Sequence, residues 1–339
     1  MKTYTCLCAL LLGCSGALQA QTQASADDGQ PGAYLSIEFG NGRMHGDNPA
    51  GTRWMGWRAL EARVGREEPI WFGPGRIDFV HYNEGHPENN HRDGFALQWV
   101  AVRPLGSRIE GELGVGPYLS MNTTTVNGRQ IDDARWGMLL SAALRIPLGA
   151  LPEGSHLRIG LNRTVMDGTH HSTALLFGIG RQFDQARPEP DTEPAAGRWW
   201  FGGSLGRSIT NLSGTHGANA GVLEARTYLD RRLEHWAVSG KLISEGDDGG
   251  RVDRDGVAGQ LWYVQQVTPR FAMSAGLGPY LARNDRDEKD KTRTIMLVSL
   301  QAERALSKAT RAFINFNRIK TFRNTNDRDL IQVGLLKRF

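Results

Sequence analysis

Histidine and carboxylate residues gather in one polar stretch of the chain. His81, Glu84, His86, His91 and Asp93 lie at the end of one alternating segment and in the run that follows it. An exposed cluster of this kind could hold a metal ion, or supply a general base and its orienting group for hydrolysis. His81, Glu84 and Asp93 are therefore the candidate catalytic residues. The competing interpretation is a solvated polar loop.

A second set of residues recurs at the same spacing in both halves of the chain. Leu60-Glu61-Ala62-Arg63 returns as Leu223-Glu224-Ala225-Arg226. Charged and apolar residues alternate here, so the charges share one side of an extended strand. We expect the recurring inward residues to line a barrel interior, as a ladder that crosslinks strands or as a guide for a polar solute. They are Glu61, Arg63, Gln98, Tyr118, Glu224, Arg226, Gln260 and Tyr280.

The elements that position these residues are strands. Gly114-Val115-Gly116-Pro117-Tyr118 and Gly276-Leu277-Gly278-Pro279-Tyr280 repeat at an offset of 162 residues, and both alternate with a period of two. One side is apolar and the other carries glycine and polar residues, which is typical of a strand between lipid and a polar interior. Eight such segments precede residue 184 and eight follow residue 197, with long and short connections in turn. The fold class is all-β: a transmembrane antiparallel β-barrel of about sixteen strands, built from two eight-strand repeats.

The sheet can close in two ways. One barrel of sixteen strands would enclose water, whereas two tandem barrels of eight would be filled by side chains. Inward faces that combine glycine with charge favour the single barrel, and the proline-rich and acidic run at 184–196 favours two. We favour the single barrel and keep two barrels as the alternative. The expected regions are an export signal (1–20), a disordered lead-in (21–31), repeat 1 (32–183), a periplasmic linker (184–196) and repeat 2 (197–339).

The first twenty residues have the pattern of an export signal. Lys2 precedes an apolar run, and Leu18-Gln19-Ala20 forms a cleavage site, so we expect cleavage near Ala20. The segment before Cys14 resembles a lipobox, which makes lipidation of Cys14 the alternative. All three cysteines lie in this segment, so a disulfide scaffold and a thiolate metal site are excluded from the mature chain. A net charge of +4 gives no argument for nucleic acid.

The C-terminal segment alternates and ends on Phe339. It resembles the last strand of Gram-negative outer-membrane β-barrel proteins, whose final phenylalanine is part of an assembly signal. The resemblance implies the cell outer membrane as location, and lipopolysaccharide and the barrel-assembly machinery as partners. Arg163 and Arg318 follow asparagines where strands leave the apolar band. They could contact lipopolysaccharide phosphate, or reach the interface without specific binding.

Three functions fit these features. The first is a polar pore or export partner for a polar solute, including polysaccharide. The second is hydrolysis of lipid A or another outer-leaflet lipid by the His81–Asp93 region. That region is loosely similar to the external sites of outer-membrane lipid A deacylases, but their His-x-Ser pattern is absent because Tyr82 and Asn83 follow His81. The third is a structural barrel with partner-binding loops. We favour passage without catalysis, metal or cofactor, because the inward residues recur in both repeats and the histidines do not.

Overall fold

A computed structural model describes most of the chain from Pro31 to Phe339. The described residues are 31–45, 54–55, 59–70, 73–85, 90–126, 129–166, 171–184, 198–209, 217–229, 235–250, 252–287, 291–321 and 326–339. The expected export signal, nearly all of the lead-in and all of the linker except Asp184 lie outside them. Within the described part, no helix is long and apolar enough to cross a membrane.

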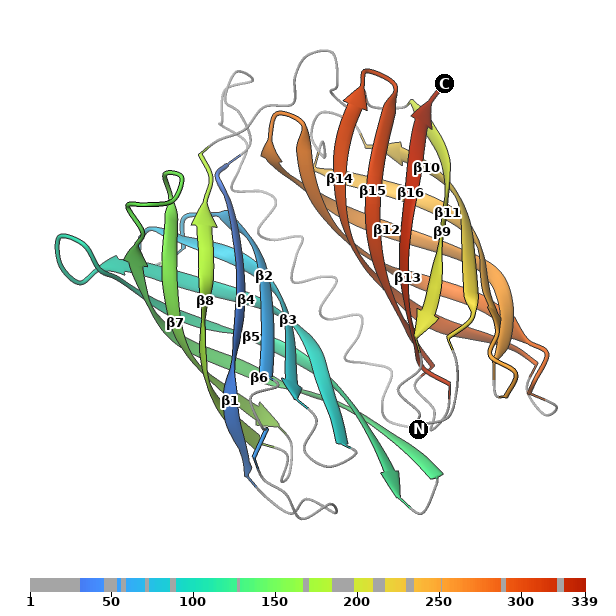
Figure 1. Ribbon diagram of the computed structural model, residues 1–339, viewed down its shortest axis with the longest axis horizontal. Helices are drawn as coiled ribbons and strands as arrows, with labels where there is room; N and C mark the ends of the chain where they lie inside the picture. Colours follow the sequence, from blue (N-terminus) through green and yellow to red (C-terminus); the bar gives the residue numbers. More distant parts are fainter. Residues whose placement is uncertain are drawn as a thin grey trace. The chain divides into compact units, whose positions relative to one another are not determined.

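The first half of the chain forms one closed antiparallel barrel, barrel 1 (Figure 1). Each strand pairs with the next, and β1 pairs with β8 to close the wall. The strands are β1 (Ala33–His45), β2 (Ala59–Glu67), β3 (Gly75–Gly85), β4 (Asn90–Pro104), β5 (Glu110–Val126), β6 (Arg129–Pro147), β7 (Ser155–Met166) and β8 (His171–Gln182).

The second half forms another closed antiparallel barrel, barrel 2, in which β16 pairs with β9. Short links join β4 to β5 and β6 to β7 in barrel 1, and β12 to β13 and β14 to β15 in barrel 2. We call the end of each barrel that carries these links the turn end, and the opposite end the loop end. The strands are β9 (Trp199–Ile209), β10 (Asn219–Tyr228), β11 (Trp236–Asp247), β12 (Asp253–Thr268), β13 (Phe271–Asn284), β14 (Thr292–Ser307), β15 (Thr310–Lys320) and β16 (Arg328–Arg338).

The structure confirms the predicted number of strands, their antiparallel pairing and the repeat of eight plus eight. The preference for one barrel of sixteen strands was wrong. The two-barrel alternative is the observed closure. Inward glycine makes room for large buried side chains here, not for water. A Cβ added to Gly180 would lie 2.4 Å from Nε2 of His156, and one added to Gly160 would lie 3.0 Å from Nη1 of Arg158.

The repeated Gly-x-Gly-Pro-Tyr motif produces the same irregularity in both barrels. Pairing between β4 and β5 stops at Ala96↔Tyr118 and resumes at Trp99↔Val115, and β12 and β13 show the matching gap. Proline cannot donate to the ladder, which explains the gap. The second glycine is required by close approach, because a Cβ on Gly116 would lie 1.8 Å from the carbonyl oxygen of Leu97.

The outside of each barrel is apolar. Phe39 and Leu113 on barrel 1 and Leu205, Leu223 and Val333 on barrel 2 are more than half exposed. Charged residues, in contrast, are buried inside. This arrangement reverses that of a soluble protein and suits a barrel surrounded by hydrocarbon.

The β5–β6 hairpin extends past its neighbours at the loop end (Figure 1). β5 and β6 have 17 and 19 residues, and pairing of β6 with β7 begins only at Gly137↔Met166. Residues 123–126 and 129–134 are therefore strand, although most of them are polar. The run Thr123-Thr124-Thr125-Val126 is β-branched throughout, which favours continued strand.

Candidate functional site

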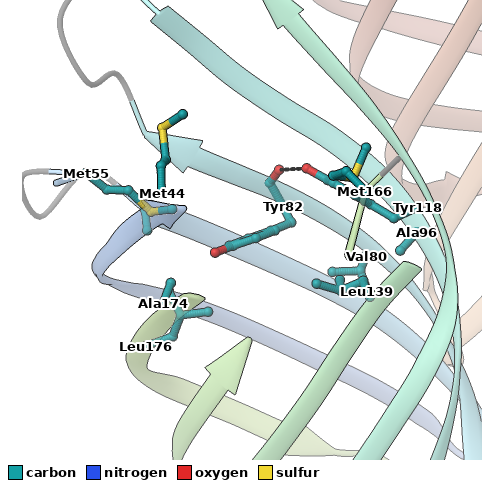
Figure 2. Close-up of a cluster of buried hydrophobic side chains, with 11 residues drawn as sticks. Met44, Met55, Val80, Tyr82, Ala96, Tyr118, Leu139, Met166, Ala174 and Leu176 are labelled. Carbon is teal, nitrogen blue, oxygen red and sulfur yellow. Dashed lines mark hydrogen bonds between the residues drawn. The ribbon is translucent and has the colours of Figure 1, made fainter. Parts of the chain in front are cut away.

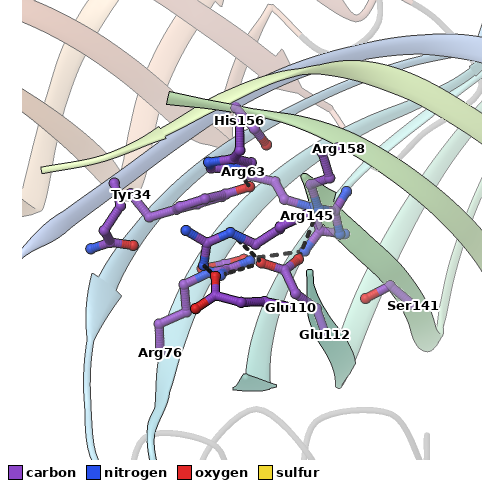
Figure 3. A network of polar contacts seen from close by, with 12 residues as sticks. Tyr34, Arg63, Arg76, Glu110, Glu112, Ser141, Arg145, His156 and Arg158 are labelled. Carbon is purple, nitrogen blue, oxygen red and sulfur yellow. Dashed lines mark hydrogen bonds and ion pairs between the residues drawn. The ribbon is translucent and has the colours of Figure 1, made fainter. Parts of the chain in front are cut away.

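A network of buried ion pairs fills the middle and the turn end of barrel 1 (Figure 3). Six strands, β1 to β3 and β5 to β7, contribute charged residues to it. Four carboxylates face four guanidinium groups, so the formal charges balance. The members, called the barrel 1 network below, are Glu38, Glu61, Asp78, Glu112, Arg63, Arg76, Arg145 and Arg158, all less than 9% exposed.

Arg158 is the centre of this network. Its Nη1 donates to both carboxylate oxygens of Glu38 at 2.6 Å and to Oε1 of Glu61 at 3.1 Å. Its Nε donates to Oε2 of Glu112 at 2.8 Å. One guanidinium on β7 therefore ties together carboxylates from β1, β2 and β5. Charges removed from water are stable only when they are paired in this way.

Other arginines extend the network to the remaining strands. Arg63 Nη1 donates to Oε1 of Gln98 at 2.7 Å and to Oδ2 of Asp78 at 3.2 Å. Arg76 donates to Asp78 and to Glu112, and its guanidinium lies 3.7 Å from the ring centroid of Tyr34. With Gln98 of β4 included, the network crosslinks strands β1 to β7 of the wall.

An apolar cluster occupies the loop end of barrel 1 (Figure 2). Met44, Met55 and Met166 are buried there beside Tyr82 and Tyr118. The hydroxyl of Tyr118 is 3.1 Å from Oε1 of a buried glutamate, Glu84, which also accepts from an arginine of β4, Arg92, at 3.3 Å. Both ends of the interior are thus occupied by side chains.

Barrel 2 contains a smaller network with unequal charge. Glu224 pairs with Arg226 at 2.7 Å and with Lys241 at 3.7 Å, while Glu303 pairs with Arg311 at 2.7 Å. Three cations therefore face two carboxylates among the described residues of this cluster, all of them buried. Arg226 and Lys241 both lie over the Trp262 ring, at 4.2 and 4.6 Å from its centroid, which stabilises cations.

At equivalent strand positions, an arginine of barrel 1 and its carboxylate partners are all replaced by uncharged residues in barrel 2. Where barrel 1 has Arg158, barrel 2 has Phe313, a buried apolar residue. The positions of Glu38 and Glu112 are Ser204 and Ser274 in barrel 2. An arginine and two of its carboxylate partners are therefore all absent from barrel 2. Unchanged positions include Glu84/Glu245, Arg92/Arg254, Gln98/Gln260, Tyr118/Tyr280, Ser141/Ser299 and Asn162/Asn317. The pair Glu61 and Arg63 recurs as Glu224 and Arg226 two residues further along its strand, since Glu38 pairs with Glu61 but Ser204 pairs with Val222.

All eight residues predicted to face the interior do so. Glu61, Arg63, Gln98 and Tyr118 are buried inside barrel 1, and Glu224, Arg226, Gln260 and Tyr280 inside barrel 2. The expected Glu–Arg ladder is present in both. Their use by a passing solute stays a prediction.

The three candidate catalytic residues are not brought together. His81 and Asp93 are on the outward side of β3 and β4, whereas Glu84 points inward to Arg92. His86 lies outside the described residues. In the part of the chain that the structure describes, no three histidine, cysteine or acidic groups could hold a metal ion.

The two arginines considered for lipopolysaccharide are already engaged within their own barrels. Arg163 donates to the hydroxyl of Thr173 at 2.8 Å. Arg318 donates to both carboxylate oxygens of Asp329 at 2.9 Å. Contact with lipopolysaccharide stays a prediction for both.

Six of the eight members of the barrel 1 network, all except Glu61 and Arg63, are not among the residues predicted to face the interior. Glu38, Arg76, Glu112 and Arg158 each stand at an inward position of a recognised strand, so alternation alone could have identified them. The predicted interior residues are those that recur in both repeats, and these four do not recur.

Known proteins resemble this chain only distantly. No family model matches the chain, and no curated protein matches it. Among solved structures, Ail of Yersinia pestis is 12% identical, with a TM-score of 0.35, over 45% of this chain and 99% of its own. Neisserial surface protein A is 12% identical, with a TM-score of 0.34, over 44% and 97%. An outer-membrane channel from Pseudomonas putida F1 is 12% identical, with a TM-score of 0.23, over 94% and 100%.

The topology of this chain by itself supports the class of outer-membrane β-barrel proteins. Sixteen antiparallel strands close into two barrels with apolar outer faces and ion-paired interiors. The chain therefore has the architecture of an outer-membrane β-barrel protein, and no narrower family is shown.

Proposed function

We propose that this chain is an outer-membrane protein whose two barrels are anchors that present their loop ends to a partner outside the cell. The observation that carries the proposal is the filled interior of barrel 1. Glu61 and Arg158 at its centre are both 0% exposed. An eight-stranded barrel is just wide enough for its own side chains, and here they are ion-paired from wall to wall. The barrel itself is then a rigid support, and the variable surface is the loop end.

The support for a membrane anchor is the reversed distribution of polarity. Exposed leucine and phenylalanine side chains surround both barrels, and a row of such residues in water would cause aggregation. Closure removes every free edge within the wall, which is what a spanning β-structure requires. The short links then belong on the periplasmic side and the long ones outside.

Fractionation and single-channel recording test this function together. Purified chain should partition with outer membranes, change its gel mobility on heating, and leave a planar lipid bilayer electrically silent. A soluble, heat-insensitive protein would refute the anchor. Large, stable conductance steps would refute the filled interior.

Passage of small polar solutes is a second proposal, favoured by barrel 2 alone. Its buried network carries three cations against two carboxylates, which would attract a small anion. We limit this proposal to small ions, because an eight-stranded barrel is only wide enough for its own side chains or one small ligand. Low anion-selective conductance that is lost in Lys241→Met, but kept in Arg283→Met on the exposed surface, would support it. Equal conductance in both variants would contradict it.

A further inference from the structure

The turn end of barrel 2 carries exposed charge of one sign. Among the described residues there, the only acidic side chain is Glu303, which is buried inside the barrel. Six cationic side chains reach the surface: Arg198, Arg270, Arg304, Lys308, Lys337 and Arg338. The turn end of barrel 1 is mixed, since Glu67 and Glu153 are exposed there beside its arginines. A surface of one sign attracts ligands of the opposite charge.

Two of these cations face outward from strands that have one strand between them. Arg304 on β14 lies opposite Ala312 on β15, and Lys337 on β16 lies opposite Thr310 of the same β15. Their Cα atoms are therefore about 12 Å apart, which is two strand spacings sideways and two residues along. In the part of the chain that the structure describes, neither side chain forms an ion pair. Two long side chains at this separation can converge on one phosphate group.

Aromatic residues mark the depth of these cations. Phe271 lies directly opposite Arg304. Phe201 and Phe339 have ring centroids 5.8 Å apart, and Nζ of Lys337 lies 5.6 Å from the centroid of the Phe339 ring. Aromatic side chains concentrate where a barrel wall meets the membrane surface. Arg304 and Lys337 are then level with the headgroups of one leaflet.

An apolar furrow begins beside the two cations. A row of outward residues, each directly opposite the next, crosses the wall from β14 to β9: Arg304, Ala312, Leu335 and Gly203. Ala312 and Gly203 are small, which leaves a hollow between this row and the next one towards the loop end. The next row is Ile314, Val333 and Leu205. Three strand spacings make this part about 14 Å long, close to the roughly 15 Å of hydrocarbon in one leaflet.

Barrel 1 differs at the corresponding positions, counted from Ser141 and Ser299, which match. The row there is Ile146, Leu157, Ile179 and Ile37. Ile146 stands in place of the arginine, and Leu157 and Ile37 stand in place of the two small residues. The cation and the two small residues therefore belong to barrel 2 and are not required by an eight-stranded wall.

We propose that Arg304, Lys337 and the furrow beside them bind an anionic glycerophospholipid of the periplasmic leaflet. The headgroup phosphate lies between the guanidinium and the ammonium group, and one acyl chain follows the furrow past Ala312. Charge selects the headgroup, because a zwitterionic lipid would bring a further cation to a surface that is already positive. The inference rests on the proposed function, which puts the turn end on the periplasmic side. Fractionation tests that function without added lipid, so the two can fail separately.

Native mass spectrometry of the folded, full-length chain counts bound lipid directly. The chain is held in zwitterionic detergent and offered equal amounts of phosphatidylglycerol and phosphatidylcholine with the same acyl chains. Wild type should prefer one phosphatidylglycerol by roughly twentyfold, since each nearby cation favours anionic lipid by about fivefold. Arg304→Gln with Lys337→Gln should lose most of that preference. Arg108→Gln removes an exposed arginine at the turn end of barrel 1, and it should behave as wild type.

Two further variants separate charge from folding and from the furrow. Arg304→Lys with Lys337→Arg keeps both charges and should keep the preference. Ala312→Phe fills the furrow, so it should weaken the binding of both lipids and leave their ratio unchanged. Heat-modifiable gel mobility shows that each variant is folded.

Several results would overturn the proposal. Wild type could bind the two lipids equally, the preference could survive in the double glutamine variant, or it could be lost when both charges are kept. Unchanged binding in Ala312→Phe would refute the furrow as the place of the acyl chain. Tighter binding of lipid A than of phosphatidylglycerol by the same two cations would make the outer leaflet the source of the phosphate, which contradicts the assignment.

Discussion

Replacing Arg158 tests whether the interior of barrel 1 is held by its charges. Arg158→Phe leaves Glu38, Glu61 and Glu112 without their shared partner and gives the network one uncompensated negative charge. Removing one member of a buried pair costs about 3–5 kcal/mol. Barrel 1 is roughly 150 residues, a size at which 1 kcal/mol shifts Tm by about 2–4 °C, so we expect a loss of roughly 6–20 °C.

The matched control comes from barrel 2, which has phenylalanine and two serines at the corresponding places. The triple variant Glu38→Ser, Glu112→Ser and Arg158→Phe leaves two carboxylates facing three guanidinium groups, which is the ratio found in barrel 2. Because one unpaired charge remains, it should recover only part of the lost Tm. Loss of heat-modifiable gel mobility and far-UV circular dichroism measure both variants. The reasoning is refuted if Arg158→Phe melts within about 2 °C of wild type, or if the triple variant melts no higher than the single one.

Three further predictions concern glycine packing, the repeated glutamine and the final residue. Gly180→Ala should lower stability by about 1–3 kcal/mol through overpacking, while Gly240→Ala, where a Cβ would meet nothing within 4 Å, should be neutral in the same melt. Gln98→Leu should cost about 1–3 kcal/mol because it leaves a buried guanidinium unsatisfied; Gln260→Leu should cost less in urea titration, since its Oε1 has no partner. Deleting Phe339 should reduce the heat-modifiable fraction in membranes on immunoblots, and an unchanged fraction would remove the assembly role.

Alternation was enough to predict the strands, their antiparallel class and the repeat. Each predicted segment overlaps one observed strand, and the Glu61–Arg63 ladder is where the pattern placed it. Closure could not be predicted in the same way. A single barrel and a pair of barrels would contain the same strands. They differ only in whether β8 pairs with β1 or with β9, and the alternation of residues along each strand is the same in both cases.

The interior was misjudged for a related reason. Glycine and charge on one strand face are compatible with water or with tight packing, and only the opposite wall decides between them. Gly160 leaves room for Arg158 and Glu38, residues whose mutual approach depends on the diameter of the barrel. That diameter is a property of closure and not of any one strand.

Independent closure has a consequence for how the two halves of this gene can change over generations. Because β1 pairs with β8 and β9 with β16, a substitution in one interior can be compensated only within that same interior. Arg158 with its glutamates, and Phe313 with its serines, are two separately reached solutions of this kind. Halves joined in one wall would have to keep two shared seams matched. Here one half is free to diverge, or to be exchanged whole by recombination between β8 and β9, while the other stays folded.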